Sequence, residues 1–132
     1  MSVIIDIQNE IVYLIKFQTS LADNFEKRIK QYPTENEATH QLKAYRERAL
    51  ESIPHLKALL REVSEIQAHF SPKHLSPRVY AFYEDKLKEA RTGLKKCKND
   101  IGHLAKVFNI IAGVRNELPR AIAAAHAHQM QA

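Results

Sequence analysis

The chain has 132 residues, of which 45% are apolar and 27% are charged, and its formal net charge is +5. This composition excludes a disordered chain, and the length suits one domain with a hydrophobic core of its own. Only three glycines and one cysteine are present, so an intramolecular disulfide is excluded. We expect a single helical domain that spans residues 1–132.

The first predicted helix covers residues 3–31. Its apolar side chains follow an alternating spacing of three and four, which places them on one face. The series is Ile4, Ile7, Ile11, Leu14, Gln18, Leu21 and Phe25. We place Gln18 at the rim of the core, with a buried glutamine that sets the register as the alternative. Tyr32-Pro33 ends this helix because proline lacks the amide donor that the next turn needs.

The amino-terminal segment is apolar enough to raise the question of a membrane. Asp6, Glu10 and Lys16 interrupt it, and no run approaches the ~18 uncharged residues that a span needs. A secretory signal would also need a basic segment and a cleavage site. We therefore expect no membrane segment and a cytoplasmic protein. Its single cysteine, Cys97, then reads as a small buried residue rather than a reactive thiol.

The second predicted helix covers residues 35–70. Thr34 and Glu37 form a capping box at its start, in which each side chain accepts a hydrogen bond from the other residue's backbone amide. Pro54 removes one backbone hydrogen bond, so we expect a kink there, with a restart capped by Ser52 or a functional hinge as alternatives. The inner face comprises Ala38, Leu42, Tyr45, Ala49, Ile53, Leu56, Leu60, Val63, Ile66 and Phe70.

A loop ends at Ser76, and Pro77 after it predicts the start of a third helix over residues 77–116. An uninterrupted heptad supports one continuous helix of about 60 Å at 1.5 Å per residue. The stripe consists of Tyr80, Tyr83, Leu87, Ala90, Leu94, Cys97, Ile101, Leu104, Phe108 and Ile111. Pro119 redirects the chain, and we expect a short fourth helix over residues 117–128.

The short connections between the predicted helices require neighbouring helices to run antiparallel. We therefore predict an all-α fold: an elongated, antiparallel, coiled-coil-like three-helix bundle with a short C-terminal fourth helix. The first helix is about 20 Å shorter than the third at the same rise per residue. Part of the third helix's stripe would then lack cover. We favour a homodimer as that cover over a folded-back C-terminal tail.

The excess of positive charge concentrates in the third predicted helix. Its basic residues line up beside the apolar stripe and form a candidate surface for an anionic partner. They are Lys86, Lys88, Arg91, Lys95, Lys96 and Lys98. Such a row suits the phosphates of a nucleic acid or an acidic face of a protein. A solvated face without a partner is the more common role of lysines on long helices.

The sequence carries no motif for catalysis, a cofactor or a metal. We find no nucleophile with its base, no phosphate-binding loop and no set of inward carboxylates. The seven histidines lack the spacing of a metal site, and we interpret them as surface or capping residues. The aromatic residues fall mostly on or beside the core faces. Phe82 lies off the stripe, where a second subunit or the loop would cover it.

These observations favour a non-catalytic interaction protein, of the adaptor, chaperone or inhibitor type, that binds a protein partner. The alternative is a nucleic-acid-binding accessory protein that uses the basic face of the third helix. Retention of DNA or RNA that weakens steeply with salt separates the two hypotheses, because phosphate contacts release counterions.

Overall fold

The computed structural model describes residues 2–131, with side chains for residues 2–127. Within this range the chain forms four α-helices and one short 3-10 helix and contains no strand, so the predicted all-α class is confirmed. The elements are α1 Val3–Lys30, α2 Glu37–His69, α3 Pro77–Lys96, η1 Ile101–His103 and α4 Leu104–Gln131.

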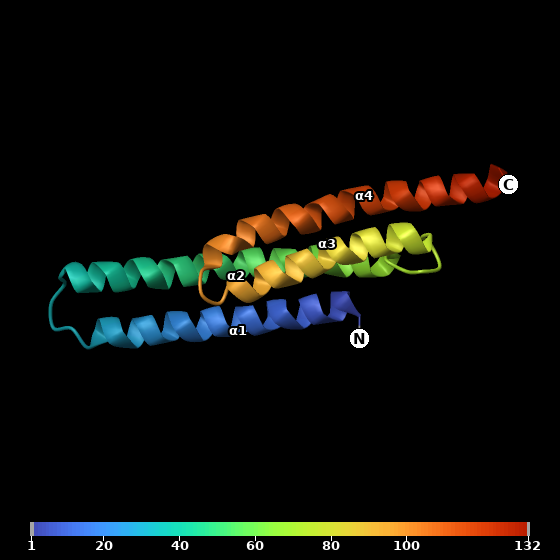
Figure 1. The fold of residues 1–132 in the computed structure, drawn as a ribbon. Coiled ribbons are helices and arrows are strands. Elements are labelled where there is room, and N and C mark those ends of the chain that lie inside the picture. The colour runs from blue at the N-terminus through green and yellow to red at the C-terminus, as the bar shows by residue number, and fades with distance from the viewer. Residues whose placement is uncertain (1, 132) are drawn as a thin grey trace.

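Two antiparallel helical hairpins, α1–α2 and α3–α4, pack together as a four-helix bundle (Figure 1). α1 packs against α3 and α2 packs against α4, and each of these pairs runs in the same direction (Figure 1). Ion pairs mark both contacts: Arg91 Nη1 lies 3.4 Å from Asp6 Oδ2, and Arg115 Nη1 lies 3.1 Å from Glu62 Oε1. The bundle is therefore built from two hairpins set side by side.

The predicted helix over residues 77–116 is wrong, because the chain leaves the helix after Lys96 and turns back. Asp100 adopts an extended conformation (φ −149°, ψ 105°), and its side chain accepts a hydrogen bond from the Gly102 amide. Beyond this turn the buried series of α4 is Leu104, Val107, Ile111, Val114 and Leu118, so Val107 takes the core position predicted for Phe108, which is only partly buried. The count of three helices is thereby corrected to four.

Two further helix predictions are also corrected. α4 continues through Pro119 to Gln131, so residues 117–128 are part of a longer helix rather than a separate one. α2 continues through Pro54, and Ser52 donates a hydrogen bond to the Ala49 carbonyl (2.6 Å) instead of capping a restarted helix. The bend expected at Pro54 stays a prediction.

The starts of α1 and α3 agree with the sequence, whereas α2 begins two residues later than expected and α4 begins at Leu104 rather than at residue 117. The Ser76 side chain accepts from the Val79 amide with Pro77 at the first helical position, as predicted. At α2 the capping box is formed by Asn36 and Thr39, not by Thr34 and Glu37. The Asn36 side chain accepts from the Thr39 amide (2.9 Å), and Thr39 Oγ1 accepts from the Asn36 amide (2.8 Å). The capping box therefore forms two residues later in the chain than the sequence predicted.

The core runs along the middle of the four helices. Leu94, Leu104 and Ile111 are buried, so the stripe expected to lack cover on the third helix is covered within one chain. Cys97 is fully buried, which confirms its interpretation as a small core residue. Gln18 is only 3% exposed, so its predicted place at the rim is wrong and the alternative of a buried glutamine holds.

The α1–α2 hairpin reaches beyond the α3–α4 turn at one end of the molecule (Figure 1). α1 and α2 have 28 and 33 residues, whereas α3 has only 20 before the chain reverses. We call the part of the α1–α2 hairpin that lies beyond this turn, residues 20–49, the arm. Only two helices are present there. The core of the arm therefore lacks the cover that α3 and α4 give to the rest of the hairpin.

Candidate functional site

Two of the predicted basic residues take part in ion pairs within the chain. Arg91 contacts Asp6 of α1, and Lys88 Nζ lies 3.5 Å from Glu84 Oε1 one helical turn earlier. Both pairs are partly exposed, so their contribution to stability is modest. They nevertheless reduce the charge that these side chains offer to an anionic partner.

Two more basic residues lie over aromatic rings. Lys86 Nζ is 5.7 Å from the centre of the Phe82 ring, and Lys98 Nζ is 5.6 Å from the centres of both Tyr13 and Phe17. The pKa of Lys98 is raised, mainly through its polar contact with the Tyr13 side chain. These are favourable cation–π distances, which hold the ammonium groups close to the protein surface.

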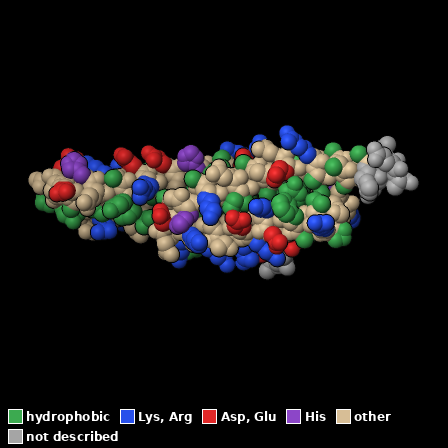
Figure 2. Space-filling view, turned by 45° about the horizontal axis from the view of Figure 1, so that its top comes forward, with side chains coloured by type: hydrophobic (Ala, Val, Ile, Leu, Met, Phe, Trp, Pro, Cys, Tyr) green, Lys and Arg blue, Asp and Glu red, His purple; other side chains and the backbone are tan. Residues whose placement is uncertain are grey.

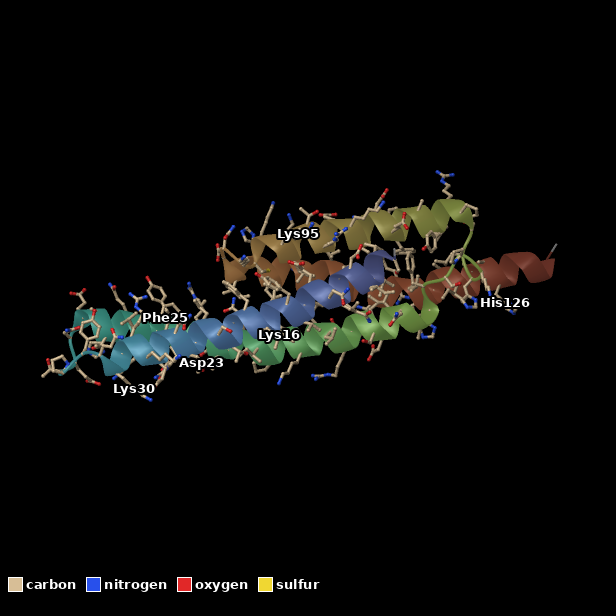
Figure 3. All side chains as sticks on the ribbon, turned by 90° about the horizontal axis from the view of Figure 1, so that it is seen from below. Lys16, Asp23, Phe25, Lys30, Lys95 and His126 are labelled. Carbon is tan, nitrogen blue, oxygen red and sulfur yellow. The ribbon has the colours of Figure 1, made fainter. Side chains whose placement is uncertain are left out.

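Lys95, which Figure 3 labels, and Lys96 complete the predicted set, and both are exposed at the end of α3. Neither forms an ion pair with any side chain that the structure describes. The six basic residues therefore differ in their surroundings. Figure 2 shows acidic and basic side chains interspersed over the middle of the face that it draws, with several basic side chains gathered along its lower edge.

A second surface, which the sequence did not single out, lies on the arm. Phe25 of α1 and Tyr45 of α2 pack together at its middle, with ring centres 5.7 Å apart and planes 30° apart. Tyr45 is 51% exposed, so its predicted place on the inner face is wrong. The reason is the length of α3: no third helix reaches this position to cover the ring.

Two hollows flank this aromatic pair, and both are lined by Phe25 and Tyr45. One, of about 210 Å³, lies toward the α3–α4 turn and also contacts Leu21 and Arg48. The other, of about 300 Å³, lies toward the end of the arm. Together they extend along the side of the arm on which the α3–α4 turn lies. The apolar residues that line these hollows, which we call the arm strip, are Leu21, Phe25, Tyr32, Ala38, Leu42 and Tyr45. Leu42 at its base is buried, Leu21 and Phe25 are partly buried, and the other three are exposed.

The arm strip continues the internal interface of the bundle. In the covered part of α1, Ile7, Ile11 and Leu14 occupy the same three–four series and are fully buried. Leu21 and Phe25 extend that series into the arm, where they are only partly buried. One apolar face therefore runs along the whole of α1. The α3–α4 hairpin covers this face up to the arm and leaves the remainder without a packed helix.

Several charged groups beside the arm strip form ion pairs within the arm, and one of these pairs joins the two helices. Arg46 of α2 contacts Glu26 of α1, and Lys30 Nζ lies 3.9 Å from the same carboxyl group. At the end of the arm, Lys43 contacts Glu35 and lowers the pKa of that carboxyl group. The apolar strip is thus bordered by charged side chains, as the core of a protein interface usually is.

The cysteine and the potential metal ligands form neither a catalytic site nor a metal site among the residues that the structure describes. Burial is the main cause that raises the pKa of the Cys97 thiol from its ordinary 9.0 to about 11, so the thiol stays protonated and unreactive near neutral pH. Within residues 2–127, no three His, Cys, Asp or Glu side chains gather as metal ligands would.

No family model, curated protein or solved structure matches the chain. None of the helices described between residues 2 and 131 combines the length and apolar content required to cross a bilayer.

Proposed function

We propose that this chain is a non-catalytic interaction protein that binds a protein partner through the arm strip. The observation that supports this proposal is the continuity of the strip with the bundle core. In the bundle, the face of α1–α2 is buried by the α3–α4 hairpin. An apolar face of the same kind without cover is characteristic of a binding surface.

The chemistry of the strip favours a helical protein as its ligand. The strip is two helices wide, and the two hollows beside the aromatic pair suit side chains from a helix laid along it. Phe25 and Tyr45 supply the large ring surface that dominates the binding energy of many interfaces. A pair of amphipathic helices, related to the arm as α3–α4 is related to the rest of the hairpin, would bury all of these groups.

Photo-crosslinking tests this proposal. A benzoylphenylalanine placed at position 45 of the full chain should yield covalent adducts with protein in the cells that make it. The matched control is position 82, where Phe82 is 53% exposed but lies on α3, away from the strip. Protein adducts that are specific to position 45 support the proposal, and their mass identifies the partner. Equal or absent adducts at the two positions contradict it.

A specific observation also favours the nucleic-acid alternative. The rings of Tyr13 and Phe17 stack, with centres 6.2 Å apart and planes 25° apart, and Lys98 lies above them. Tyr13 is exposed, and the exposed Lys95 and Lys96 lie at the same end of α3. Aromatic rings beside lysines are the elements with which proteins bind single-stranded nucleic acids.

Fluorescence anisotropy with labelled single-stranded RNA and DNA tests this alternative. Binding through this surface should weaken steeply as salt rises, and Lys95→Glu with Lys96→Glu should abolish it. Lys57→Glu with Lys73→Glu, at exposed positions on α2 and in the loop before α3, is the charge-matched control and should change binding much less. No binding in low salt, or equal losses in both variants, contradicts the alternative.

A further inference from the structure

We infer that the ligand of the arm strip is an amphipathic helix whose apolar face is bordered by acidic residues. This inference rests on the proposed function, namely that the strip binds protein, and it names the chemistry of the partner. The helix lies between α1 and α2 on the arm, and its acidic side chains meet basic residues at the edges of the two hollows.

The shape of the strip suits a single helix of about three turns. Both hollows are lined by α1 and α2 together, so one helix laid between the two can fill them with side chains from one face. Along α2 the lining extends from Ala38 to Ala49, which is about 16 Å at 1.5 Å per residue. Apolar residues spaced three and four apart in the ligand supply a face of this length.

The charged residues that line the hollows are mostly basic. Arg28 lines the hollow at the end of the arm, and Arg48 and Lys98 line the one beside the α3–α4 turn. Among the described residues of the two linings, the only carboxylate is that of Asp100, and its Oδ1 accepts a hydrogen bond from the Gly102 amide (2.9 Å). The linings are therefore net positive, and negative charge at the edges of a ligand complements them.

The acidic residues of the arm do not balance this positive charge. Two of them, Glu26 and Glu35, already pair with basic residues of the arm. Figure 3 shows Asp23 on the side of α1 away from Phe25. None of the acidic residues of the arm lines either hollow; they are Asp23, Glu26, Glu35, Glu37 and Glu47. The positive charge of the linings is therefore available to a ligand.

Two of the basic residues lie on opposite sides of the strip. Arg28 belongs to α1 and Arg48 to α2, both are exposed, and neither forms an ion pair with any side chain that the structure describes. A helix between α1 and α2 presents one edge of its apolar face to each of them, as the charged flanks of a coiled-coil helix do. Arginine binds a carboxylate through two parallel hydrogen bonds, so acidic side chains at both edges fit these positions.

The α3–α4 turn adds positive charge at the bundle end of the strip. Lys95 and Lys96 are exposed and directly precede the residues of the turn that line a hollow. Such charges attract an acidic ligand over a distance and raise its rate of association, and salt screens this attraction. The basic surface predicted from the sequence thereby speeds binding at the strip.

Selection from a displayed peptide library tests the inference. The probe is a set of helical peptides of about 18 residues, long enough for four turns and more. Their apolar positions carry leucine or phenylalanine, and the positions that border them carry glutamate or lysine at random. Peptides retained by the full wild-type chain should carry glutamate about threefold more often than lysine at these border positions.

Two neutral substitutions test whether the selected peptides bind the strip. Tyr45→Ala should lower their affinity about fivefold, because an aromatic ring at the centre of the interface is lost. Phe82→Ala, at an exposed position on α3, is the matched control and should leave their affinity unchanged. Circular dichroism verifies that both variants retain their helix content.

Charge reversal at the edges of the strip tests the chemistry of the partner. Selection on Arg28→Glu with Arg48→Glu should favour lysine instead of glutamate. Lys57→Glu with Lys73→Glu changes the net charge of the chain by the same amount at exposed positions outside the arm. This control should keep the preference for glutamate, since a preference set by net charge alone would be lost in both variants.

Several outcomes overturn the inference. They are the absence of retained peptides, peptides that need Tyr45 but show no preference for glutamate, and a preference that both charge reversals change equally. Displacement of the peptides by single-stranded RNA, together with no effect of Tyr45→Ala, also overturns it and assigns the basic residues to a nucleic acid. In each of these cases, protein adducts specific to position 45 would leave the proposed function standing.

Discussion

At the scale of single residues, the distance between α3 and α4 depends on a glycine. A Cβ atom at Gly93 would lie 2.8 Å from Val107 Cγ2, which is closer than carbon atoms pack. Valine cannot turn away easily, because its branched Cβ leaves few rotamers. At Gly113, by contrast, an added Cβ would meet nothing within 4 Å. The two glycines lie in helices of the same hairpin but serve different purposes.

Substitution of these glycines by alanine should therefore change stability in opposite directions. Gly93→Ala should lower the free energy of unfolding by about 1–3 kcal/mol, because the clash with Val107 outweighs the gain in helix propensity. Gly113→Ala should raise it by about 0.5–1 kcal/mol, since alanine favours the helix and meets no neighbour. Urea denaturation measures both values. A stabilisation by Gly93→Ala equal to that of Gly113→Ala would show that the two helices are not in close contact.

The burial of single residues was predicted correctly where it depends only on the position of the residue in its own helix. Cys97 occupies a heptad position and is buried, as that position predicts. Tyr45 also occupies an apolar position and is half exposed, because its burial depends on a helix elsewhere in the chain. Periodicity shows which face of a helix is apolar. It does not show how far the neighbouring helices extend.

At the scale of helices, the starts of α1, α2 and α3 were predictable to within two residues, whereas the start of α4 at Leu104 was not. Ser76 and Pro77 identify the start of α3 because both signals act on adjacent residues. At α2, Thr34 with Glu37 and Asn36 with Thr39 each fit the spacing of a capping box, and the structure uses the second. Asparagine is among the most effective N-cap residues, which favours the later start.

These two possibilities for α2 make opposite predictions. Asn36→Ala should lower the free energy of unfolding by about 0.5–2 kcal/mol, the usual cost of losing an N-cap. Thr34→Ala should have little effect, because Thr34 is exposed and precedes the helix. Thermal or urea unfolding of both variants decides between them. A larger loss for Thr34→Ala than for Asn36→Ala would move the helix start back to the position expected from the sequence.

At the scale of the whole molecule, the main difference from the sequence prediction is the turn between α3 and α4. The heptad passes through residues 97–103 with its phase intact, so periodicity alone favours one long helix. The local signal for a turn was present in Asn99-Asp100 with Gly102, which is the polar and glycine-containing pattern of a loop. The all-α class was predictable, whereas the arm strip was not, because it exists only where this turn ends the cover of α1 and α2.

Distances between spin labels distinguish the hairpin from a continuous helix. Arg78 and Arg120 are exposed near the start of α3 and in the second half of α4. Their neighbours Val79 and Ala121 line the same hollow, so the two labelled positions lie close together in the hairpin. Two helix diameters and the lengths of the two label side chains add up to a distance of at most about 30 Å between the labels. One continuous helix would separate positions 78 and 120 by about 63 Å at 1.5 Å per residue.

Labels at Glu37 and Glu65 provide the matched control, because both positions are exposed and lie within α2. Their separation should be about 42 Å, the length of 28 residues of helix. Dilution of the labelled protein with an excess of unlabelled chain removes distances between labels on two different molecules. A dominant distance near 63 Å between positions 78 and 120 would show that α3 and α4 form one rod. The chain would then have no α3–α4 hairpin, and the arm strip would need a different explanation.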